Sequence, residues 1–247
     1  MQQFGIIGYP LGHSFSANLF NAKFQNEHID ARYDLMPLNQ IDECKKVFQI
    51  PNLVGLNVTI PYKQVIIPYL DELSDEANAI GAVNVIHVTN KNGIRRLKGY
   101  NTDVIGFRES IKPLLNPSHK SALVFGTGGA SKAVAYGLKQ LGVSVQLISR
   151  TKRPNTLTYV ELTADMISSH TILVNATPLG MHPNVDACVP IDYSAITANH
   201  LLYDVIYNPN KTLFLQYGEN AGATINNGLG MLDGQAQAAW KIWNNNE

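Results

Sequence analysis

The chain has 247 residues, of which 45% are hydrophobic and 15% are charged, a globular rather than a disordered composition. This length accommodates one large domain or two ordinary ones, and we expect two. The formal net charge is zero and the pI is about 7.1, so no global field attracts nucleic acid or an anionic membrane surface. The expected partner is a small molecule.

The compartment and the metal chemistry are also restricted by the sequence. The N-terminal residues lack a basic region and a long apolar core, and no later stretch approaches the ~18 apolar residues that a membrane helix needs. We therefore expect a cytoplasmic protein that does not bind membranes. Cys44 and Cys188 have no CxxC spacing and no nearby histidine cluster, which predicts two ordinary thiols, no disulfide and no metal site.

Apolar, β-rich runs alternate with helical patterns in the first part of the chain, which predicts an α/β sheet. The turn signal Asn90-Lys91-Asn92-Gly93 predicts a hairpin at the sheet edge, between 85–88 and 94–97. The expected strands are 4–9, 33–38, 53–60 and 82–88, and the expected helices are 16–26 and 40–48.

A second α/β unit is expected after a helix that Thr102 can cap and that Asn116-Pro117 ends. Its expected strands are 121–125, 143–148, 172–175 and 201–205, with a helix from Lys132 to about residue 141. The final helix is predicted after Gly228, and its apolar face consists of Leu232, Ala236, Ala239 and Trp243.

A glycine-rich loop, Gly126-Thr127-Gly128-Gly129-Ala130-Ser131, follows the first strand of the second unit and opens a helix. A lone GxGxxG or GxGxxA pattern is weak evidence, because glycine pairs are frequent in turns. Here the strand before it and the helix after it create the setting in which backbone amides and a helix N-terminus bind a pyrophosphate. The loop is therefore interpreted as a Rossmann-like dinucleotide site.

The charges that follow the loop favour NADP over NAD. In NAD-binding versions an acid about 20 residues beyond the loop binds the ribose 2′-hydroxyl. No acid occurs here between Glu109 and Glu161, whereas Arg150, Lys152 and Arg153 follow the second strand, where the 2′ substituent would lie. A solvated basic turn is the alternative interpretation. The glycine loop at the right distance upstream favours the cofactor.

Polar side chains gather at strand ends in the first unit. Asn57, Thr59 and Lys63 lie between a predicted buried strand and a predicted helix, and buried polar groups need partners in the protein or in a polyhydroxylated ligand. Ligands of open α/β sheets bind at the carboxyl ends of the strands. The full set is Ser14, Ser16, Asn57, Thr59, Lys63, Asn84 and Asn101-Thr102-Asp103.

Two of these residues carry charges of opposite sign. Lys63 beside Asp103 would keep its proton and could exchange it with a substrate oxygen. The alternative interpretation of Asp103 is structural, because its charge would stabilise the helix dipole by ~0.3–1 kcal/mol. No Ser-His-Asp order, metal cluster or phosphoryl-transfer motif competes with this pair. His13 and His182 are interpreted as structural or solvent-facing rather than catalytic.

Short motifs are spread over nearly the whole chain. They are Ile7 to Ser14, Asn57 to Lys63, Ile80 to Asn84, Gly99 to Asp103, Gly126 to Ser131, Asn175 to Met181, and Asn227 to Leu232 followed by Gln235. By these motifs the sequence resembles the shikimate dehydrogenases. Each motif is modest alone, but their order and spacing make the resemblance specific.

This resemblance implies an NADP-linked, reversible reduction of 3-dehydroshikimate to shikimate, a step of chorismate and aromatic amino-acid biosynthesis. It also implies two α/β domains with the active site in the cleft between them. The substrate-binding catalytic domain would comprise 1–102 and 228–247, and the Rossmann-like NADP-binding domain 103–227. Similar proteins include monomers and dimers, so either state is expected.

The resemblance further implies roles for individual residues. Lys63 and Asp103 would be the catalytic pair, and Tyr207 would reach the substrate from the cofactor domain. The remaining substrate contacts would be Ser14, Ser16, Asn57, Thr59, Asn84, Thr102 and Gln235. The cofactor contacts would be Gly126, Gly128, Gly129 and Ala130 at the pyrophosphate, Ser149, Arg150, Thr151, Lys152 and Arg153 at the adenosine phosphate, and Thr177, Val205, Gly228 and Met231 at the nicotinamide.

The sequence departs from the usual pattern of these proteins at three positions. Thr127 replaces the common Ala of the glycine loop, and Ser149 replaces the Asn before Arg-Thr, so both bear on adenosine binding. Val104 follows Asp103 where Gly is usual. Two alternatives to a dedicated shikimate dehydrogenase are a quinate/shikimate dehydrogenase of broader range and a non-catalytic NADP-binding sensor.

Overall fold

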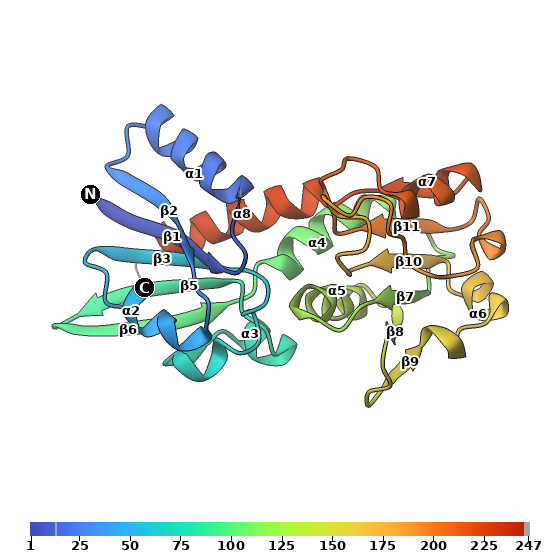
Figure 1. Cartoon of the computed structure of the whole chain (residues 1–247), viewed down its shortest axis with the longest axis horizontal. Helices are drawn as coiled ribbons and strands as arrows, with labels where there is room; N and C mark the ends of the chain where they lie inside the picture. Colours follow the sequence, from blue (N-terminus) through green and yellow to red (C-terminus); the bar gives the residue numbers. More distant parts are fainter. Residues whose placement is uncertain (13, 245–247) are drawn as a thin grey trace. The chain divides into compact units, whose positions relative to one another are not determined.

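The computed structural model describes residues 1–12 and 14–244 (Figure 1). His13, for which the sequence predicts no catalytic role, lies outside the described residues, as do residues 245–247. The chain divides into two compact units, Met1–Thr102 with Ala236–Glu247, and Asp103–Gln235. Each unit contains one six-stranded sheet, which confirms the expected α/β fold. Among the described residues, no helix has the length and apolar character needed to cross a membrane.

The first unit is built on a mixed sheet with strand order β2-β1-β3-β5-β6-β4. Strands β1, β2 and β3 run parallel, and β5 pairs antiparallel with both β3 and β6. The strands are β1 (Gln2–Gly8), β2 (Ala31–Pro37), β3 (Leu53–Val58), β4 (Glu72–Leu73), β5 (Val85–Lys91) and β6 (Ile94–Tyr100). The helices are α1 (Phe15–Asn26), η1 (Ile41–Glu43), α2 (Cys44–Val47), η2 (Ile67–Tyr69), α3 (Asp75–Ile80) and part of α8 (Leu229–Asn244).

One face of this sheet is covered by α1 and the end of α8. Phe4, Phe20 and Trp243 are buried there within a single aromatic cluster. The indole nitrogen of Trp243 donates a 3.0 Å hydrogen bond to the Ile86 carbonyl oxygen. Gly55 on β3 is required at this position, because a Cβ on it would overlap the Trp243 indole. Of the apolar face predicted for the last helix, Ala236, Ala239 and Trp243 therefore pack in this cluster, whereas Leu232 belongs to the second unit.

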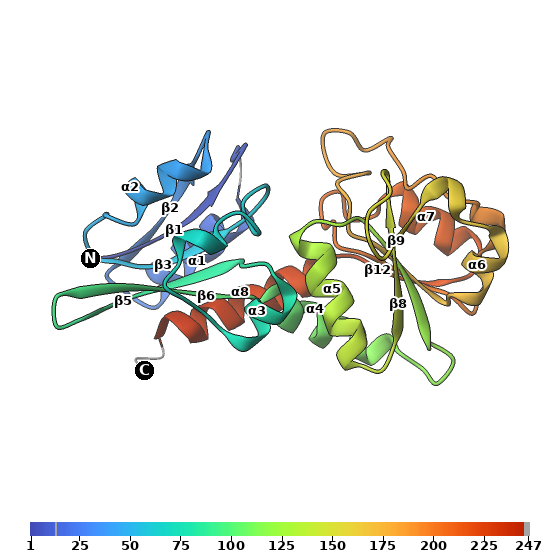
Figure 2. The ribbon, with the colours of Figure 1, turned by 90° about the horizontal axis from the view of Figure 1, so that it is seen from below.

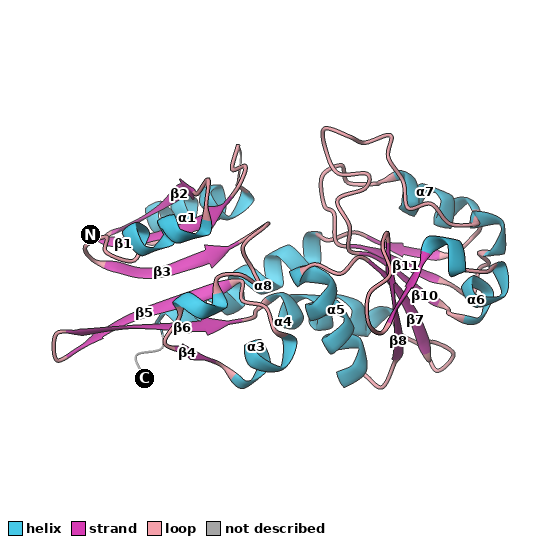
Figure 3. Ribbon diagram, turned by 60° about the horizontal axis from the view of Figure 1, so that its bottom comes forward, coloured by secondary structure: helices cyan, strands magenta, loops and turns pink. Residues whose placement is uncertain are grey.

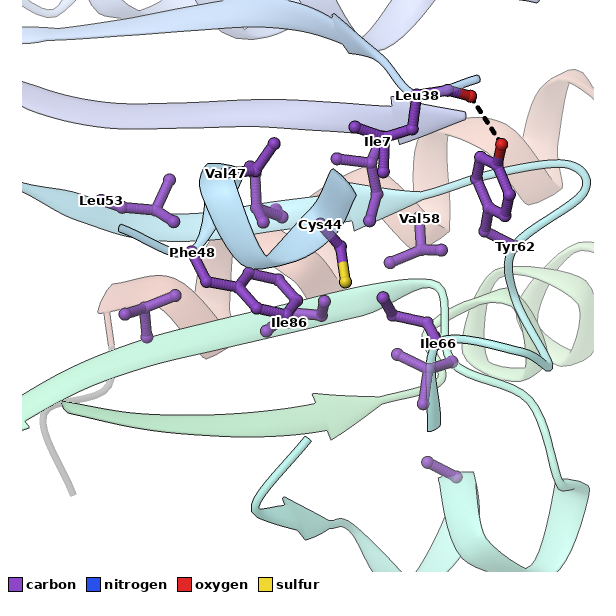
Figure 4. Close-up of a cluster of buried hydrophobic side chains, with 14 residues drawn as sticks. Ile7, Leu38, Cys44, Val47, Phe48, Leu53, Val58, Tyr62, Ile66 and Ile86 are labelled. Atoms are coloured by element: carbon purple, nitrogen blue, oxygen red, sulfur yellow. Dashed lines mark hydrogen bonds between the residues drawn. The ribbon is translucent and has the colours of Figure 1, made fainter. Parts of the chain in front are cut away.

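The other face carries a second cluster, shown in Figure 4, to which Cys44, Phe48 and Ile86 contribute. Tyr62 extends this cluster, and its hydroxyl donates a hydrogen bond of 2.5 Å to the Leu38 carbonyl oxygen. Cys44 is fully buried, and burial raises the pKa of its thiol to about 11, so it behaves as an apolar core residue. Neither Cys44 nor Cys188 forms a disulfide.

The second unit contains an all-parallel sheet with strand order β12-β11-β10-β7-β8-β9. Read from the other edge, the chain order is three-two-one-four-five-six, which is the Rossmann arrangement. The strands are β7 (Ser121–Phe125), β8 (Ser144–Ser149), β9 (Thr156–Thr158), β10 (Ile172–Asn175), β11 (Leu201–Asp204) and β12 (Thr224–Asn226). The helices are α4 (Asp103–Ile111), η3 (Lys112–Leu114), α5 (Gly129–Gln140), η4 (Tyr159–Glu161), α6 (Ala164–Ser169), η5 (Tyr193–Ala195) and α7 (Leu213–Asn220).

The central strands of this sheet are apolar without alternation because both of their faces are covered. Val124 packs into a cluster with α4 and α5, and its neighbours Leu123 and Phe125 pack into a cluster with α7. All three residues are completely buried. This two-sided burial explains the short, continuous apolar runs that predicted β7, β10 and β11 correctly.

The structure corrects several of the predicted elements. The hairpin is present, but β6 is not the sheet edge, since the two-residue strand β4 pairs with it (Figure 3). Strand β5 begins at Val85, because residues 82–84 form the turn that holds Asn84. The helix predicted for 40–48 is limited to η1 and α2, and α5 begins at Gly129 rather than Lys132.

No regular helix follows β3 directly, contrary to the sequence prediction. Residues 60–66 form successive turns, in which the Tyr62 amide donates to the Thr59 carbonyl and the Ile66 amide to the Tyr62 carbonyl. Pro68 has no amide hydrogen to donate to the Gln64 carbonyl oxygen, so a helix that began at Pro61 could not continue regularly past this point. The turns instead bury Tyr62 and Ile66 in the core.

Candidate functional site

The polar residues predicted in the first unit lie at one edge of its sheet. Strands β1, β3 and β6 end there, and antiparallel β5 begins there, because Asn57 pairs with Val85 and Val85 pairs with Tyr100. The structure therefore brings together residues that are far apart in sequence. They are Asn57 and Thr59 at the end of β3, Lys63 in the following turns, Asn84 before β5 and Thr102 after β6.

Asn57 is 4% exposed, and its amide is oriented by two partners. The Tyr33 hydroxyl donates to Asn57 Oδ1 at 2.6 Å, and Asn57 Nδ2 donates to the Asn84 carbonyl oxygen at 3.3 Å. A tyrosine donor on one side and a carbonyl acceptor on the other fix which amide atom is oxygen. Burial raises the pKa of Tyr33 well above its usual value, against a hydrogen bond with the Ser16 side chain that lowers it. The neutral hydroxyl of Tyr33 thus links Ser16 to Asn57.

Asn84 and Thr102 form a second pair, buried beside the first. Asn84 Nδ2 donates to Thr102 Oγ1 at 2.9 Å, and Asn84 Oδ1 accepts the Thr102 amide at 2.6 Å. Asn101 Nδ2 donates to the Ala82 carbonyl oxygen at 2.9 Å, which ties the end of β6 to the turn before β5. Asp103 follows Thr102 directly and begins α4, so its backbone starts from a residue that Asn84 holds.

The backbone of Lys63 is anchored to the same turn. Its carbonyl oxygen accepts the Val83 amide at 2.7 Å, one residue before Asn84, and its side chain is half-buried. Thr59 is also half-buried, and its amide donates to the Ile7 carbonyl oxygen at 2.9 Å. Lys63 is thus held by hydrogen bonds at the sheet edge, in a series of turns rather than in the helix expected from the sequence.

Ser14 acts as the N-cap of α1, where its hydroxyl oxygen accepts the Ala17 amide at 3.3 Å. Its extended backbone, with φ of −128°, is the conformation an N-cap residue adopts. Ser16 is 6% exposed, on the face of α1 toward Tyr33. The two serines therefore have different local roles, one as a cap and the other in the buried network.

The glycine loop of the second unit lies at the end of β7, next to the end of β10. Gly126 has a φ of +115°, and a Cβ on it would meet the Ala176 carbonyl oxygen at 2.8 Å, so glycine is required by the fold. Gly128 is different. Its φ is −78°, it is the N-cap of α5 without a side-chain cap, and a Cβ there would meet no protein atom within 4 Å. The loop fits a cofactor phosphate, because Gly128 leaves space in front of first-turn amides of α5.

The basic turn after β8 contains exposed Arg150, Thr151, Lys152 and Arg153. Lys152 is paired with Glu161, its Nζ lying 2.6 Å from Oε1, and this hydrogen bond is the main reason that the pKa of Glu161 falls to about 2. In the described part of the chain, neither Arg150 nor Arg153 has an ion pair. Glu161, the acid that ends the acid-free interval of the sequence, thus pairs with Lys152 of the turn. Arg150 and Arg153 are the cations of the turn that no ion pair compensates in the described residues.

The base of this turn is ordered by Ser149, which is 6% exposed at the end of β8. Its hydroxyl oxygen accepts the Thr151 amide at 3.4 Å. The Ser149 departure noted in the sequence is therefore compatible with a closed turn, since its hydroxyl can serve as an acceptor for the backbone.

A buried carboxylate, Asp204, joins the loops that follow β10 and β11. It accepts hydrogen bonds from Asn175 Nδ2 at 3.1 Å, from Thr212 Oγ1 at 2.6 Å and from the Ile206 amide at 2.9 Å. Asn175 Oδ1 in turn accepts the Thr177 hydroxyl at 2.7 Å. Burial raises the pKa of Asp204 to about 6, against these hydrogen bonds, which lower it. This network determines the path of the chain around Thr177.

The remaining predicted cofactor residues lie near the ends of β11 and β12. The Gly228 amide donates to the Ile206 carbonyl oxygen at 3.0 Å, and a Cβ on Gly228 would overlap the backbone of Val205. Met231 is 7% exposed on α8. The Gln235 side chain is also buried, and its Nε2 donates to the Leu232 carbonyl oxygen at 3.0 Å.

Asp103 and Tyr207 have contrasting surroundings within the second unit. Asp103 is 5% exposed as the first residue of α4, where a negative charge complements the helix dipole. Tyr207 is partly exposed after β11, and burial raises the pKa of its hydroxyl, so it is a neutral hydrogen-bonding group at neutral pH. Val104, which stands where similar proteins usually have Gly, is fully buried in the first turn of α4.

Sequence reasoning missed Tyr33 and Asp204. Tyr33 appeared only as the start of an apolar strand, and nothing in the sequence connects it with Asn57, 24 residues later. Asp204 was part of an apolar strand, where an acid at the last position is the available signal, since a buried carboxylate needs partners. No group of three or more His, Cys, Asp or Glu able to hold a metal occurs among residues 1–12 and 14–244.

The order of the second sheet and the loop at the end of its central strand define a Rossmann-type α/β protein. Residues 6–86 match the sequence profile of the shikimate dehydrogenase substrate binding domain. A shikimate dehydrogenase (NADP(+)) of Caldanaerobacter subterraneus is 38% identical over 97% of this chain and 90% of the relative. The chain therefore belongs to the shikimate dehydrogenase family.

Solved structures agree with this assignment. A shikimate 5-dehydrogenase from Thermus thermophilus, in complex with NADP(H) and shikimate, is 29% identical with a TM-score of 0.84, over 99% of this chain and 94% of that one. A quinate dehydrogenase from Corynebacterium glutamicum, in complex with NAD, is 27% identical with a TM-score of 0.85, over 98% of this chain and 93% of that one. The expected α/β fold is thus shared with structures of a shikimate 5-dehydrogenase and of a quinate dehydrogenase.

Proposed function

We propose that this chain catalyses the reversible, NADPH-dependent reduction of 3-dehydroshikimate to shikimate. The observation that carries this proposal is the buried network of Asn57, Asn84 and Thr102 in a member of this family, with Lys63 anchored to the same sheet edge. Such an edge offers hydroxyl and amide groups to the hydroxyls of a cyclic acid. Ser14, Ser16, Thr59, Tyr207 and Gln235 complete the proposed substrate contacts.

In the proposed mechanism Lys63 hydrogen-bonds the C3 carbonyl oxygen and supplies a proton to it, directly or through water. The opposite charge of Asp103 orients the Lys63 ammonium in this mechanism. NADPH supplies the hydride when it is bound. The residues proposed to hold it are Gly126, Gly128, Gly129, Ala130, Ser149, Arg150, Thr151, Lys152, Arg153, Thr177, Val205, Gly228 and Met231.

The activity is tested by the change in absorbance at 340 nm when shikimate and NADP are added to the purified chain. The same assay with quinate separates a dedicated shikimate dehydrogenase from an enzyme of broader range, the alternative favoured by the likeness to a quinate dehydrogenase. Absence of turnover with either substrate, together with measurable NADP binding, would instead favour the sensor alternative. We expect shikimate to be the better substrate.

The role of Lys63 is tested by Lys63→Ala and Asp103→Asn, alone and combined. We expect each single variant to lower kcat by about 10²-fold or more, on the scale of general acid–base catalysis. Because the two residues are proposed to act as a unit, the double variant should lose little more than the worse single variant. Near wild-type kcat in Lys63→Ala would contradict the proposed role.

The cofactor preference is tested by comparing kcat/KM for NADP and NAD in wild type, Arg150→Ala and Lys152→Ala. Arg150→Ala should lower kcat/KM for NADP by roughly tenfold or more and leave that for NAD nearly unchanged, since the guanidinium is proposed to bind the 2′-phosphate. Lys152→Ala should have a smaller effect, because Glu161 already pairs with this ammonium. A wild-type preference for NAD would refute the proposal.

A cytoplasmic location and a monomeric or homodimeric state complete the proposal. Two cysteines that form no disulfide fit a reducing compartment. The oligomeric state is measured by sedimentation of the purified chain at micromolar concentration. The proposed substrate-binding catalytic domain comprises 1–102 and 228–247 and the proposed NADP-binding domain 103–227, whereas residues 228–235 belong to the second compact unit.

A further inference from the structure

A cavity of about 360 Å³ lies over the β5–β6 hairpin, next to the end of α8. None of the residues proposed above to bind substrate or cofactor lines it. Its lining includes His87 and Lys91 from β5, Arg96 and Lys98 from β6, and Glu72 from β4. The chemistry of this lining is therefore separate from the proposed active site.

The strand register explains why the basic side chains meet. His87 pairs with Lys98, Thr89 with Arg96, and Lys91 with Ile94. Because alternate residues of a strand face the same side, His87, Thr89 and Lys91 share one face of β5. It is the face on which α8 lies, seen in Figure 2, where α8 runs along β5 and β6. Ile242 contributes to the lining from α8, and the hairpin and β4 supply the other lining residues.

His87 is the buried polar group of the cavity, with only 7% of its surface exposed. Within residues 1–12 and 14–244, no hydrogen bond to its imidazole is found, and no fully buried side-chain nitrogen or oxygen lacks a partner, so the ring nitrogens are accessible from the cavity. Burial, and secondarily the Lys98 charge, lowers the pKa of this imidazole. The imidazole therefore has hydrogen-bonding capacity that no protein group uses and that a molecule in the cavity can use.

The charges around His87 are predominantly positive. Lys91, Arg96 and Lys98 line the cavity, whereas Glu72 is the single acid of the lining. The Lys98–Glu72 pair is long, with 3.8 Å between Nζ and Oε2, and Arg96 lies equally far from Asp71, at 3.8 Å. In the described part of the chain Lys91 forms no ion pair. Partly exposed pairs of this length are weak, so they hold neither Arg96 nor Lys98 firmly.

We propose that this cavity binds a small ligand that bears a phosphate or carboxylate group. His87 donates a hydrogen bond to an oxygen of the ligand from one ring nitrogen. Arg96 and Lys98 neutralise its charge, and the Tyr100 ring, over which Lys98 lies at 5.7 Å, holds that ammonium in place. The bound anion accepts a hydrogen bond from the imidazole and offsets the repulsion between the cations.

The test is a titration of the full-length protein, with histidine rings isotopically labelled and observed by NMR. Inorganic phosphate and acetate are added in separate series, against sodium chloride at matched ionic strength. The His87 signals are identified by their loss in His87→Gln. We expect a saturable shift of these signals with at least one of the two anions and none with chloride, and the responding series identifies the group that is bound.

Two variants separate this site from general surface charge. Arg96→Gln should weaken the binding about tenfold, in line with the loss of a charge-assisted hydrogen bond. Lys45→Gln removes an exposed cation from α2, outside the cavity, and should bind as wild type does. The proposal is overturned if neither anion shifts the His87 signals saturably, or if Arg96→Gln and wild type bind with equal affinity.

Discussion

At the scale of single residues, the amide of Asn57 is held in one orientation by the Tyr33 hydroxyl. That hydroxyl has Asn57 and Ser16 as partners, and it lies in a stacked aromatic pair with Phe20, at 5.1 Å between ring centroids. Apolar packing therefore positions a polar network. Removing the hydroxyl while retaining the ring isolates its contribution.

Tyr33→Phe should lower the free energy of unfolding by about 1–3 kcal/mol, since Asn57 Oδ1 would remain buried without its donor. The Asn57 amide would also lose its fixed orientation. We therefore expect KM for shikimate to rise while KM for NADP stays near the wild-type value. Urea unfolding and steady-state kinetics measure the two effects.

Tyr69→Phe is the matched control for this substitution. The Tyr69 hydroxyl also donates to a side-chain oxygen, at 2.7 Å from Asp42 Oδ1, but near the surface where water can replace it. Its loss should change the unfolding free energy by less than about 1 kcal/mol and leave KM for shikimate unchanged. Equal effects of the two substitutions would show that Tyr33 has no special positioning role.

The sequence predicted which residues belong to the site only where they stand in a recognisable pattern. Asn57, Thr59, Lys63, Asn84 and Thr102 were chosen because they are polar and end predicted strands, and the structure brings them to one sheet edge. The hydrogen-bond partners of these residues could not be predicted from local sequence patterns. A bond such as that from Tyr33 to Asn57 depends on the order of the strands in the sheet, which hydrophobic periodicity does not reveal.

At the scale of elements, long amphipathic or fully buried segments were predicted and short ones were missed. Strands β4, β9 and β12 have two or three residues each, too few for an alternating pattern. The turns after β3 were predicted as a helix, because Pro61 followed by apolar residues resembles a helix start. Tertiary burial of Tyr62 and Ile66 determined that segment instead.

Some glycines of the second unit are required by the packing of the fold, whereas others have open space beside them that a ligand can occupy. Gly128→Ala should leave the unfolding free energy within about 1 kcal/mol of wild type, because its φ of −78° suits alanine and a Cβ there meets no protein atom. The added methyl group would occupy the space proposed for the cofactor phosphate. KM for NADP should therefore rise several-fold, measured by steady-state kinetics at saturating shikimate.

Gly228→Ala provides the contrast, since its Cβ would overlap the backbone of Val205. We expect it to destabilise the protein by more than about 2 kcal/mol, a magnitude typical of overpacking against rigid backbone. Thermal unfolding of the two variants side by side tests the distinction. A stability loss in Gly128→Ala equal to that in Gly228→Ala would mean that the loop glycine serves the fold rather than a ligand.

At the scale of the whole molecule, the chain contains two compact units with separate cores. Both tryptophans, Trp240 and Trp243, belong to the first unit, so their fluorescence reports its unfolding. Asp204 lies at the centre of a network in the second unit. The pH dependence of stability can thus be assigned to a unit by comparing tryptophan fluorescence with circular dichroism.

Asp204 should make the second unit less stable as the pH rises from about 4 to about 7. Its pKa in the folded chain, about 6, lies above the ordinary value of 3.8, so the folded state holds the proton more tightly. This stabilisation is complete below pH 3.8 and is lost as the pH rises through 6. The loss is about 3 kcal/mol, because the pKa values of the folded and unfolded states differ by about two units. Urea unfolding followed by circular dichroism measures it.

Asp204→Asn should remove the Asp204 contribution to this pH slope, because no proton is then exchanged at the site. Asp192→Asn is the control, since Asp192 is exposed and a hydrogen bond from Ser194 lowers its pKa, so its contribution falls below the pH window used. This variant should keep the wild-type slope. If Asp204→Asn and wild type lose stability equally between pH 4 and 7, the buried carboxylate does not titrate with the fold, and its network is held by an anion throughout.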